Sequence, residues 1–439
     1  CTRLSFSHHH SFTFSGGTED INLLANVNIK DDEGIMLNSW RKQLSGYINL
    51  GWQVKPWFHL QASITGGHSE GNNITDYGAT HLNETRLMLE SLPFMPVRYE
   101  DGTYTRKGDY PGTEEAENPV KMLMERKSIE GRQYVFGNFA ANFKINQYLE
   151  FISTWGAQGT ARYRYDWSGN DIYDFSERQQ GYATRFHWNS INWSNEDYFR
   201  YFRTIEKHQI EAMLGASWYF NSEDFTQAGA EGFFDNAFEY YNLGIGAVYQ
   251  RPGSSYNQNT MNSYYTRFNY NYDERYYATI TMRSDGSSRF GLNNKYAFFP
   301  SFSGAWRLSN EKFFREATGI VNNLKLRASY GFVGNAGIGN YRTIDRLNEA
   351  NVVFNKENVP AVVLGNMRND NLTWEKSRQL NIGIDVGFLK DRIEIIADVY
   401  EKITTDLLYN KSLPATTGYS SAISNIGSVR NRGIEFSIT

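Results

Sequence analysis

Apolar and polar residues alternate along many long segments of this chain. Such a period of two is typical of a β-strand whose two faces meet different surroundings. We count about fourteen strands of this kind, and many reach the length of roughly nine residues that a tilted strand needs to cross a bilayer. The clearest examples lie at residues 21–30, 44–54, 58–65, 139–145, 276–283, 301–308, 324–330, 379–388 and 392–399.

The connections between the predicted strands differ strongly in length. Short turns are predicted at Lys55-Pro56 and Asn146-Gln147. Outer-membrane barrels combine short periplasmic turns with long extracellular loops. Long polar loops are predicted at about Gly66 to Gly131, Gly159 to Lys207 and Val333 to Arg378. The pattern therefore predicts an all-β fold, an antiparallel transmembrane β-barrel.

The composition agrees with a chain of strands and turns. Aromatic residues make up 16% of the 439 residues, and 38 Gly stand against 9 Pro, a balance that favours strands and tight turns. No run of about 18 consecutive apolar residues occurs, which excludes a helical membrane protein. The net charge of −4 provides no broad basic field, so nucleic acid is not an expected partner.

The alternation also predicts which side chains face the barrel interior. Lipid must meet the apolar set of each strand, so the polar set is expected to line the lumen. These residues either contact a solute or a plug, or they form a hydrated interior that supports the barrel. The lumen-lining candidates are Arg283, Arg307, Arg327, Asp385, Glu394 and Asp398.

Aromatic residues gather in the predicted loop from Gly159 to Lys207, where they alternate with charged and amide side chains. Flat rings stack on sugar faces while neighbouring polar groups hydrogen-bond to hydroxyls. The alternative is that these rings only pack the loop. The substrate-binding candidates are Tyr163, Tyr165, Trp167, Trp188 and Trp193.

The sequence contains no pattern that indicates catalysis. No GxSxG turn or HExxH helix is present. His8, His9 and His10 cannot converge on one ion, because adjacent strand residues point to opposite faces. We therefore predict that the protein is not an enzyme, and that it has no metal site and no cofactor.

Several motifs along the chain are similar to those of a known family. The most specific are RSDGSSRFG at 283–291, FPS at 299–301 and GAWRLS at 304–309; LKLRASYG at 324–331, LTWEK at 372–376 and VRNRGIE at 429–435 follow in order. They resemble the SusC/RagA family of TonB-dependent transporters. The resemblance implies import of glycans or peptides through the outer membrane of a Gram-negative cell. It also implies a SusD-like surface lipoprotein as a lid and the TonB complex as the source of energy.

The chain also departs from the family pattern. No segment resembles the plug domain or the TonB-contacting box, and Thr439 lies inside an alternating strand. Because transporters of this size close with about 22 strands, we expect residues 1–439 to form part of a barrel without the plug domain and the C-terminal strands. TonB would then act through a plug outside this chain.

The predicted function is active import of oligosaccharides by a SusC-like barrel. One alternative is a peptide or siderophore importer of the same barrel class. An alternative from another class is a soluble, secreted, β-rich carbohydrate-active enzyme or glycan-binding protein. That class would show short strands and repeats of about 40 to 50 residues, and the sequence shows neither.

Overall fold

The structure is a computed structural model that describes residues 1–73, 84–106, 108–111, 117–170, 172, 181–317, 319–390 and 392–439. The described chain consists mainly of β-strands. They are β1 (Ser7–Gly17), β2 (Ile21–Glu33), β3 (Trp40–Lys55), β4 (Phe58–Asn72), β5 (Arg126–Lys144), β6 (Leu149–Ser168), β7 (Tyr182–Ile205), β8 (His208–Glu231), β9 (Val248–Tyr249), β10 (Gly253–Tyr272), β11 (Tyr276–Ser287), β12 (Tyr296–Arg307), β13 (Val321–Asn335), β14 (Leu347–Phe354), β15 (Glu357–Leu364), β16 (Glu375–Phe388), β17 (Ile393–Thr405), β18 (Leu408–Ser412), β19 (Ser421–Asn425) and β20 (Ser428–Ile438).

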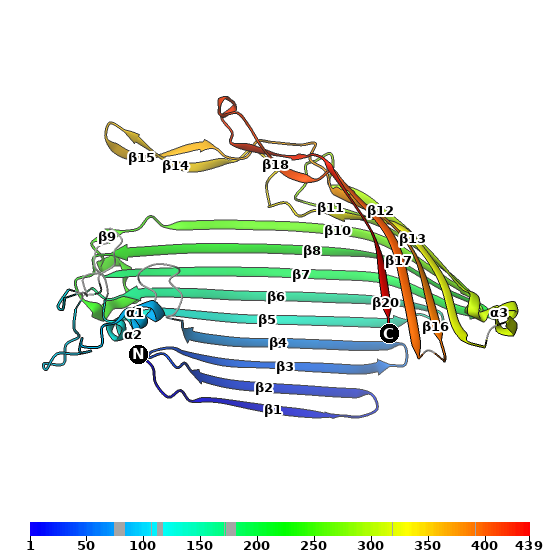
Figure 1. The fold of residues 1–439 in the computed structure, drawn as a ribbon, viewed down its shortest axis with the longest axis horizontal. Coiled ribbons are helices and arrows are strands. Elements are labelled where there is room, and N and C mark those ends of the chain that lie inside the picture. The colour runs from blue at the N-terminus through cyan, green and yellow to red at the C-terminus, as the bar shows by residue number, and fades with distance from the viewer. Residues whose placement is uncertain are drawn as a thin grey trace.

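The helices in the described part of the chain are short. They are α1 (Glu84–Glu90), α2 (Pro119–Glu125) and α3 (Lys312–Ala317), with 3₁₀ turns η1 (Asn236–Tyr241), η2 (Leu243–Ile245), η3 (Leu308–Asn310) and η4 (Ala415–Thr417). No helix among the described residues has the length and apolar character needed to span a membrane. Figure 1 shows α1 and α2 at one end of the strands and α3 at the other.

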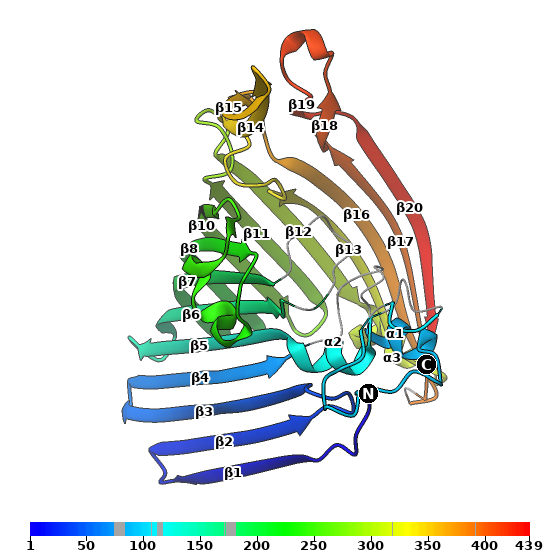
Figure 2. The same ribbon diagram turned by 90° about the vertical axis from the view of Figure 1, so that its left-hand side faces the viewer.

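The strands form one 16-stranded antiparallel sheet in which neighbours along the chain pair with each other. Its order runs from β1 to β8, then through β10, β11, β12, β13, β16 and β17 to β20, and β9 pairs with β8. The sheet curves into an open trough (Figures 1 and 2). The hairpins β14–β15 and β18–β19 form separate two-stranded sheets beyond the long-loop end. The predicted all-β, antiparallel architecture is confirmed, with more strands than the expected fourteen.

The register divides the sheet into two faces of opposite character. The apolar face carries large side chains that are exposed, and an exposed apolar surface of this extent is what a lipid environment requires. It includes Ile64, Phe139, Trp155, Ile191, Leu214, Ile280, Phe302, Leu326, Ile382 and Val399. The polar face includes Asn49, Ser63, Asn138, Ser194, Ser217, Ser263, Arg283, Ser303, Arg327, Asp385 and Asp398.

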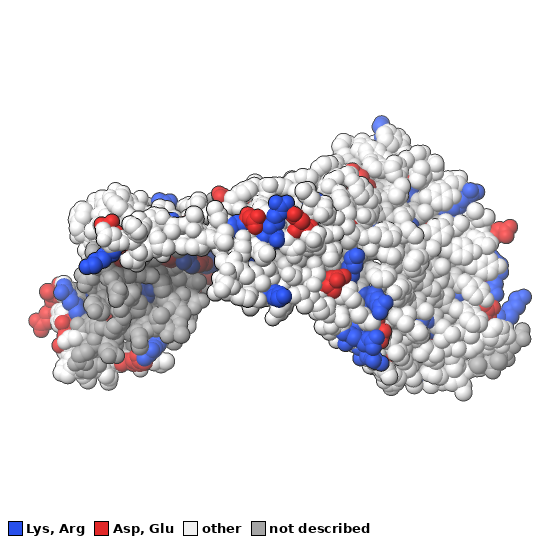
Figure 3. Space-filling view, turned by 90° about the horizontal axis from the view of Figure 1, so that it is seen from above, with Lys and Arg blue, Asp and Glu red and all other residues white. Residues whose placement is uncertain are grey.

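The charged residues are sparse when the molecule is viewed from above. Figure 3 shows broad areas without Lys, Arg, Asp or Glu, and the charges that are visible occur in small groups. This distribution agrees with a wall that has one lipid-facing surface, because charges on that surface are costly.

One of the predicted long loops is wrong. Residues 159–207 were expected to form a loop, but β6 continues to Ser168 and β7 spans Tyr182–Ile205. Polar and aromatic side chains occupy both faces of these extended strands, so the hydrophobic alternation is lost while the backbone ladder continues. The loop predicted at Gly66 to Gly131 contains α1 and α2, and its residues 74–83, 107 and 112–116 lie outside the described residues.

Three of the family-like motifs meet in one buried cluster near the long-loop end. Phe290, Phe299 and Trp374 come from three of these motifs, and the ring centroid of Trp374 lies 4.9 Å from Phe290 and 5.6 Å from Phe299. The indole N–H of Trp374 donates to the carbonyl of Lys295 at 3.1 Å. Gly334 leaves room for the ring of Phe299, whose Cζ would lie 2.1 Å from an added Cβ. The motifs therefore hold the loop-bearing ends of β11, β12, β13 and β16 together.

Candidate functional site

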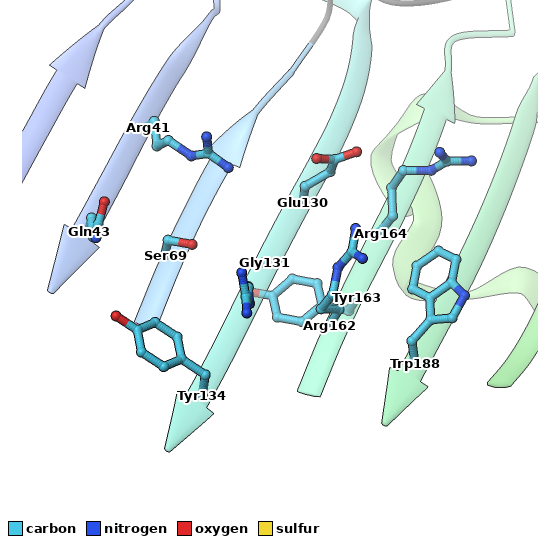
Figure 4. A pocket seen from close by; sticks show the side chains of 11 residues that line it. Arg41, Gln43, Ser69, Glu130, Gly131, Tyr134, Arg162, Tyr163, Arg164 and Trp188 are labelled. Carbon is cyan, nitrogen blue, oxygen red and sulfur yellow. The ribbon is translucent and has the colours of Figure 1, made fainter. Parts of the chain in front are cut away.

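A pocket of about 760 Å³ opens on the polar face, near the long-loop ends of β3 to β7 (Figure 4). Volumes of this size are typical of sites for small molecules and short oligomers. The lining is rich in arginine. It consists of Arg41, Gln43, Ser69, Glu130, Gly131, Arg132, Tyr134, Arg162, Tyr163, Arg164 and Trp188.

Strand register brings these side chains together. Gln43 pairs with Ser69, Ser69 with Arg132, Arg132 with Arg162, and Arg162 with Trp188, which gives one row across five strands. Because the side-chain period of a strand is two, all five residues point to the same face. The next row contains Arg41, Glu130 and Arg164, with Gly71 between the first two.

The charges of the pocket are only partly balanced. Arg164 forms an ion pair with Asp166, with Nε to Oδ2 at 3.0 Å. Arg132 and Arg162 lie against rings instead, with the guanidinium carbons 5.3 Å from the centroid of Tyr134 and 5.7 Å from that of Trp188. Within the described chain, no carboxylate lies within 4.0 Å of Arg41, Arg132 or Arg162, whereas four other polar-face or turn arginines are paired.

The five predicted substrate-binding residues do not form one site. Trp188 lies on the polar face and lines the pocket, where its ring stacks on Phe186 and Phe225 at 5.5 and 5.2 Å. Tyr163 contacts the edge of the pocket, with its ring across Gly131 and its hydroxyl donating to Glu70 at 2.5 Å.

The remaining three aromatic residues lie elsewhere. Tyr165 packs between Tyr163 and Tyr240, and Trp167, which is only 4% exposed, contacts Phe233 edge to face. Both belong to the packing beneath the connection that follows β8. Trp193 lies on the apolar face, where it stacks with Phe220 at 6.1 Å. This position turns its ring away from the pocket.

The six lumen-lining candidates all lie on the polar face. Arg327 forms ion pairs with Asp385 at 2.7 Å and with Asp398 at 3.0 Å. Arg283 pairs with Asp285 at 2.7 Å, and Nε of Arg307 donates to Asn323 at 3.2 Å. Glu394 is in register with Gly387, two residues along β17 from Ile396 and on the same side as Asp398. These residues form separate groups and do not join the arginine pocket.

Sequence reasoning missed Arg41 and Arg132. Both continue the polar alternation of their strands, as Arg41-Gln43 and Arg132-Tyr134, beyond the apolar positions that define the predicted strands. Extending the period of two would have placed each residue on the polar face. The alignment of the five strands that brings them together is set by register, which one strand at a time does not reveal.

An exposed apolar face, a polar face and loops of unequal length at the two ends define a class of protein, the outer-membrane β-barrel. The chain belongs to the TonB dependent receptor-like, β-barrel family, which it matches over residues 97–439. The predicted SusC/RagA resemblance and the predicted outer-membrane location are confirmed at the level of this family.

Two relatives illustrate the similarity in sequence. TonB-dependent receptor P3 of Formosa agariphila is 32% identical over 431 residues, which cover 97% of this chain and 42% of that protein. TonB-dependent receptor SusC of Bacteroides thetaiotaomicron is 27% identical over 477 residues, which cover 99% of this chain and 45% of SusC. The chain thus spans less than half the length of these relatives.

A solved structure shares the fold. The RagAB peptide transporter matches with a TM-score of 0.81 and 24% identity, over 98% of this chain and 48% of that one. At this identity the likeness concerns the fold alone. The sheet described above thus has the fold of about half of that chain.

Proposed function

We propose that the full-length protein imports oligosaccharides actively through the outer membrane, as the SusC-like barrel of a two-component complex. The observation that carries this proposal is the pocket on the polar face, where the rings of Trp188 and Tyr134 lie against the guanidinium groups of Arg162 and Arg132. Gln43 and Ser69 add groups that donate hydrogen bonds at the other end of the same row. An aromatic ring next to convergent polar side chains suits a sugar, which has both an apolar face and hydroxyl groups.

The rings and hydrogen-bonding groups of the pocket favour a glycan substrate, and the fold shared with the RagAB peptide transporter keeps a peptide importer as the second candidate. Uptake by cells distinguishes the two. A strain that lacks the gene and is complemented with the full-length protein should accumulate labelled oligosaccharides but not labelled peptides of similar size. Accumulation of the peptides alone would overturn the oligosaccharide assignment.

The proposal includes two protein partners. A SusD-like surface lipoprotein would cover the long-loop end of the barrel, and the TonB complex would act on a plug to release the substrate. Purification of the native receptor from outer membranes, followed by peptide sequencing, should identify the lipoprotein. Deletion of TonB should abolish uptake without lowering the amount of receptor in the membrane. Uptake that persists without TonB would contradict energised import and indicate passive diffusion.

The proposed role is transport rather than catalysis. The named relatives are receptors, and the pocket offers arginine, amide and hydroxyl groups that bind rather than a nucleophile with an adjacent base. Incubation of the purified receptor with an imported oligosaccharide should leave the chain length of the sugar unchanged. Release of shorter products would contradict this role.

A further inference from the structure

The pocket on the polar face has an excess of positive charge. Four arginines line it, Glu130 is the one carboxylate in its lining, and Asp166 neutralises Arg164 from the side. Elsewhere on the polar face, Arg200 pairs with Glu150 at 2.6 Å and Arg283 with Asp285 at 2.7 Å, whereas Arg307 donates to an amide, that of Asn323. Among the described residues the pocket is distinguished by bringing together three arginines that have no carboxylate within 4.0 Å, namely Arg41, Arg132 and Arg162.

The arrangement of two of these arginines is unfavourable without a ligand. Arg132 and Arg162 are direct cross-strand partners on β5 and β6, and their side chains share the polar face. Like charges directly opposite each other destabilise a sheet. Both strands pair in a regular ladder along their whole length, which holds the two residues opposite each other. An anion between the two guanidinium groups would remove the repulsion.

Guanidinium groups are well suited to bind such an anion. They form paired, charge-assisted hydrogen bonds with the planar edge of a carboxylate and with the oxygens of sulfate-like groups. Arg41 lies across from this pair on β3, on the far side of β4 (Figure 4). Three cations without a carboxylate partner are therefore spread across four strands. Such spacing suits a ligand with several charges along its length better than a single small ion.

The rings in the lining indicate what carries these charges. Trp188 lies directly opposite Arg162, and Tyr134 follows Arg132 on the same face of β5. Arg132 and Arg162 therefore each lie against a flat apolar surface. An acidic sugar residue fits such a pair, since its ring contacts the aromatic side chain while its carboxylate or sulfate group meets the guanidinium.

We propose that this pocket selects oligosaccharides that bear carboxylate or sulfate groups, with Arg132 and Arg162 as the principal contacts of the anion. This inference rests on the proposed function, because it assigns a substrate class to the same importer. Arg41 supplies a further contact for a longer chain. Neutral oligosaccharides of equal length bind more weakly, since they leave the repulsion between Arg132 and Arg162 in place.

Calorimetry on the full-length receptor, in complex with its lipoprotein, tests the inference. The probes are an oligogalacturonate, a sulfated carrageenan oligosaccharide, a neutral malto-oligosaccharide and an oligoglutamate peptide, all of similar length. At least one anionic sugar should bind about tenfold or more tightly than the neutral sugar, and the double variant Arg132→Gln with Arg162→Gln should lose about tenfold in affinity for it. The first two probes distinguish carboxylate from sulfate.

A matched control is Arg267→Gln, which removes an exposed arginine from the polar face of β10, outside the pocket. It should leave all affinities unchanged. Heat-dependent mobility on gels verifies that each variant forms a folded barrel. Equal binding of neutral and anionic sugars, or an unaltered double variant, would overturn the inference. Preference for the peptide over both anionic sugars would also overturn it.

The uptake assay separates this inference from the proposed function. TonB-dependent accumulation of neutral and acidic oligosaccharides at equal rates would leave glycan import intact and overturn the selectivity alone. Failure to accumulate any oligosaccharide would overturn both. Faster uptake of the acidic sugar, lost in the double variant, supports both.

Discussion

Arg327 reaches Asp398 across the backbone of Gly383, with 3.0 Å between Nη2 of the arginine and Oδ2 of the aspartate. The three residues lie in register on β13, β16 and β17. A Cβ at position 383 would lie 2.3 Å from Oδ1 of Asp398 and 2.8 Å from Nη2 of Arg327. The glycine therefore makes room for an ion pair between strands that are not direct neighbours.

We expect Gly383→Ala to displace this ion pair and to lower the free energy of unfolding by about 1–3 kcal/mol, because the two charged groups lose their contact. Urea unfolding of the full-length receptor in lipid vesicles measures the change. Gly159→Ala on β6 is the control, since an added Cβ there meets nothing within 4 Å. Equal stability of the two variants would show that the space at Gly383 is not required.

The two faces of the sheet should tolerate charge very differently. Leu214 is 65% exposed on the apolar face of β8, and Ser217 lies on the polar face of the same strand, beside Glu196. Leu214→Arg should cost roughly 2–4 kcal/mol of folding free energy in vesicles, the range for arginine at the bilayer midplane. Ser217→Arg should cost less than about 1 kcal/mol. A reversed order would contradict the assignment of the faces.

Glu311 should make the stability dependent on pH. It lies in the connection between β12 and β13 and accepts hydrogen bonds from the hydroxyl of Tyr276 at 2.7 Å, the indole N–H of Trp306 at 3.1 Å and the guanidinium of Arg275 at 3.0 Å. These donors, with the Tyr276 hydroxyl first, hold the pKa of Glu311 below its ordinary value of 4.5. The carboxylate therefore contributes stability above pH 4.5, and the contribution is lost as the pH falls through the lowered pKa.

Glu311→Gln should be less stable than the parent protein at neutral pH, and the difference should shrink as the pH falls below 4.5 and through the lowered pKa of Glu311. Urea unfolding at several pH values measures it. Glu206→Gln, in the exposed turn between β7 and β8, is the control and should show no such trend. A difference that is constant over the whole pH range would mean that ionisation of Glu311 is not the cause.

Trp374 should be among the most costly positions to truncate. It is 3% exposed and packs against Phe290 and Phe299. Trp374→Ala should lower the free energy of unfolding by about 3–5 kcal/mol, through lost burial and the cavity left behind. Tyr409→Ala, at a position that is 63% exposed, should change it by less than about 0.5 kcal/mol. Near-equal effects would contradict a structural role for the motif around Trp374.

The fold class could be predicted from the sequence because strands that span a membrane alternate strictly between apolar and polar residues. Residues such as Ile280 and Phe302 face lipid and lie between polar neighbours, so the strands there are plain in the sequence. The strand β7 was missed, because Phe186 and Trp188 on its polar face stand between His187 and Asn189 on the other. In this part of β7 the backbone hydrogen bonds continue although apolar and polar residues no longer alternate.

The candidate site was predicted less well than the fold. Trp188 was predicted from the sequence, whereas Arg132 was not. Arg132 lies in the same row as Trp188, two strands away. The two residues are far apart in the chain, and only the register of β5, β6 and β7 brings them onto one row. Trp193 has the same residue type as Trp188, but the two positions lie an odd number of residues apart along β7, so their side chains point to opposite faces. Composition alone does not contain this distinction.

One face of this sheet is expected to meet lipid and the other a water-filled interior. Electron paramagnetic resonance distinguishes the two faces, with single spin labels at Leu214 and Ser217 in full-length receptor that is free of other cysteines and embedded in vesicles. The label at 214 should be accessible to oxygen and protected from a water-soluble nickel complex, and the label at 217 should show the reverse. Equal accessibility of both labels to the nickel complex would contradict a membrane-spanning wall.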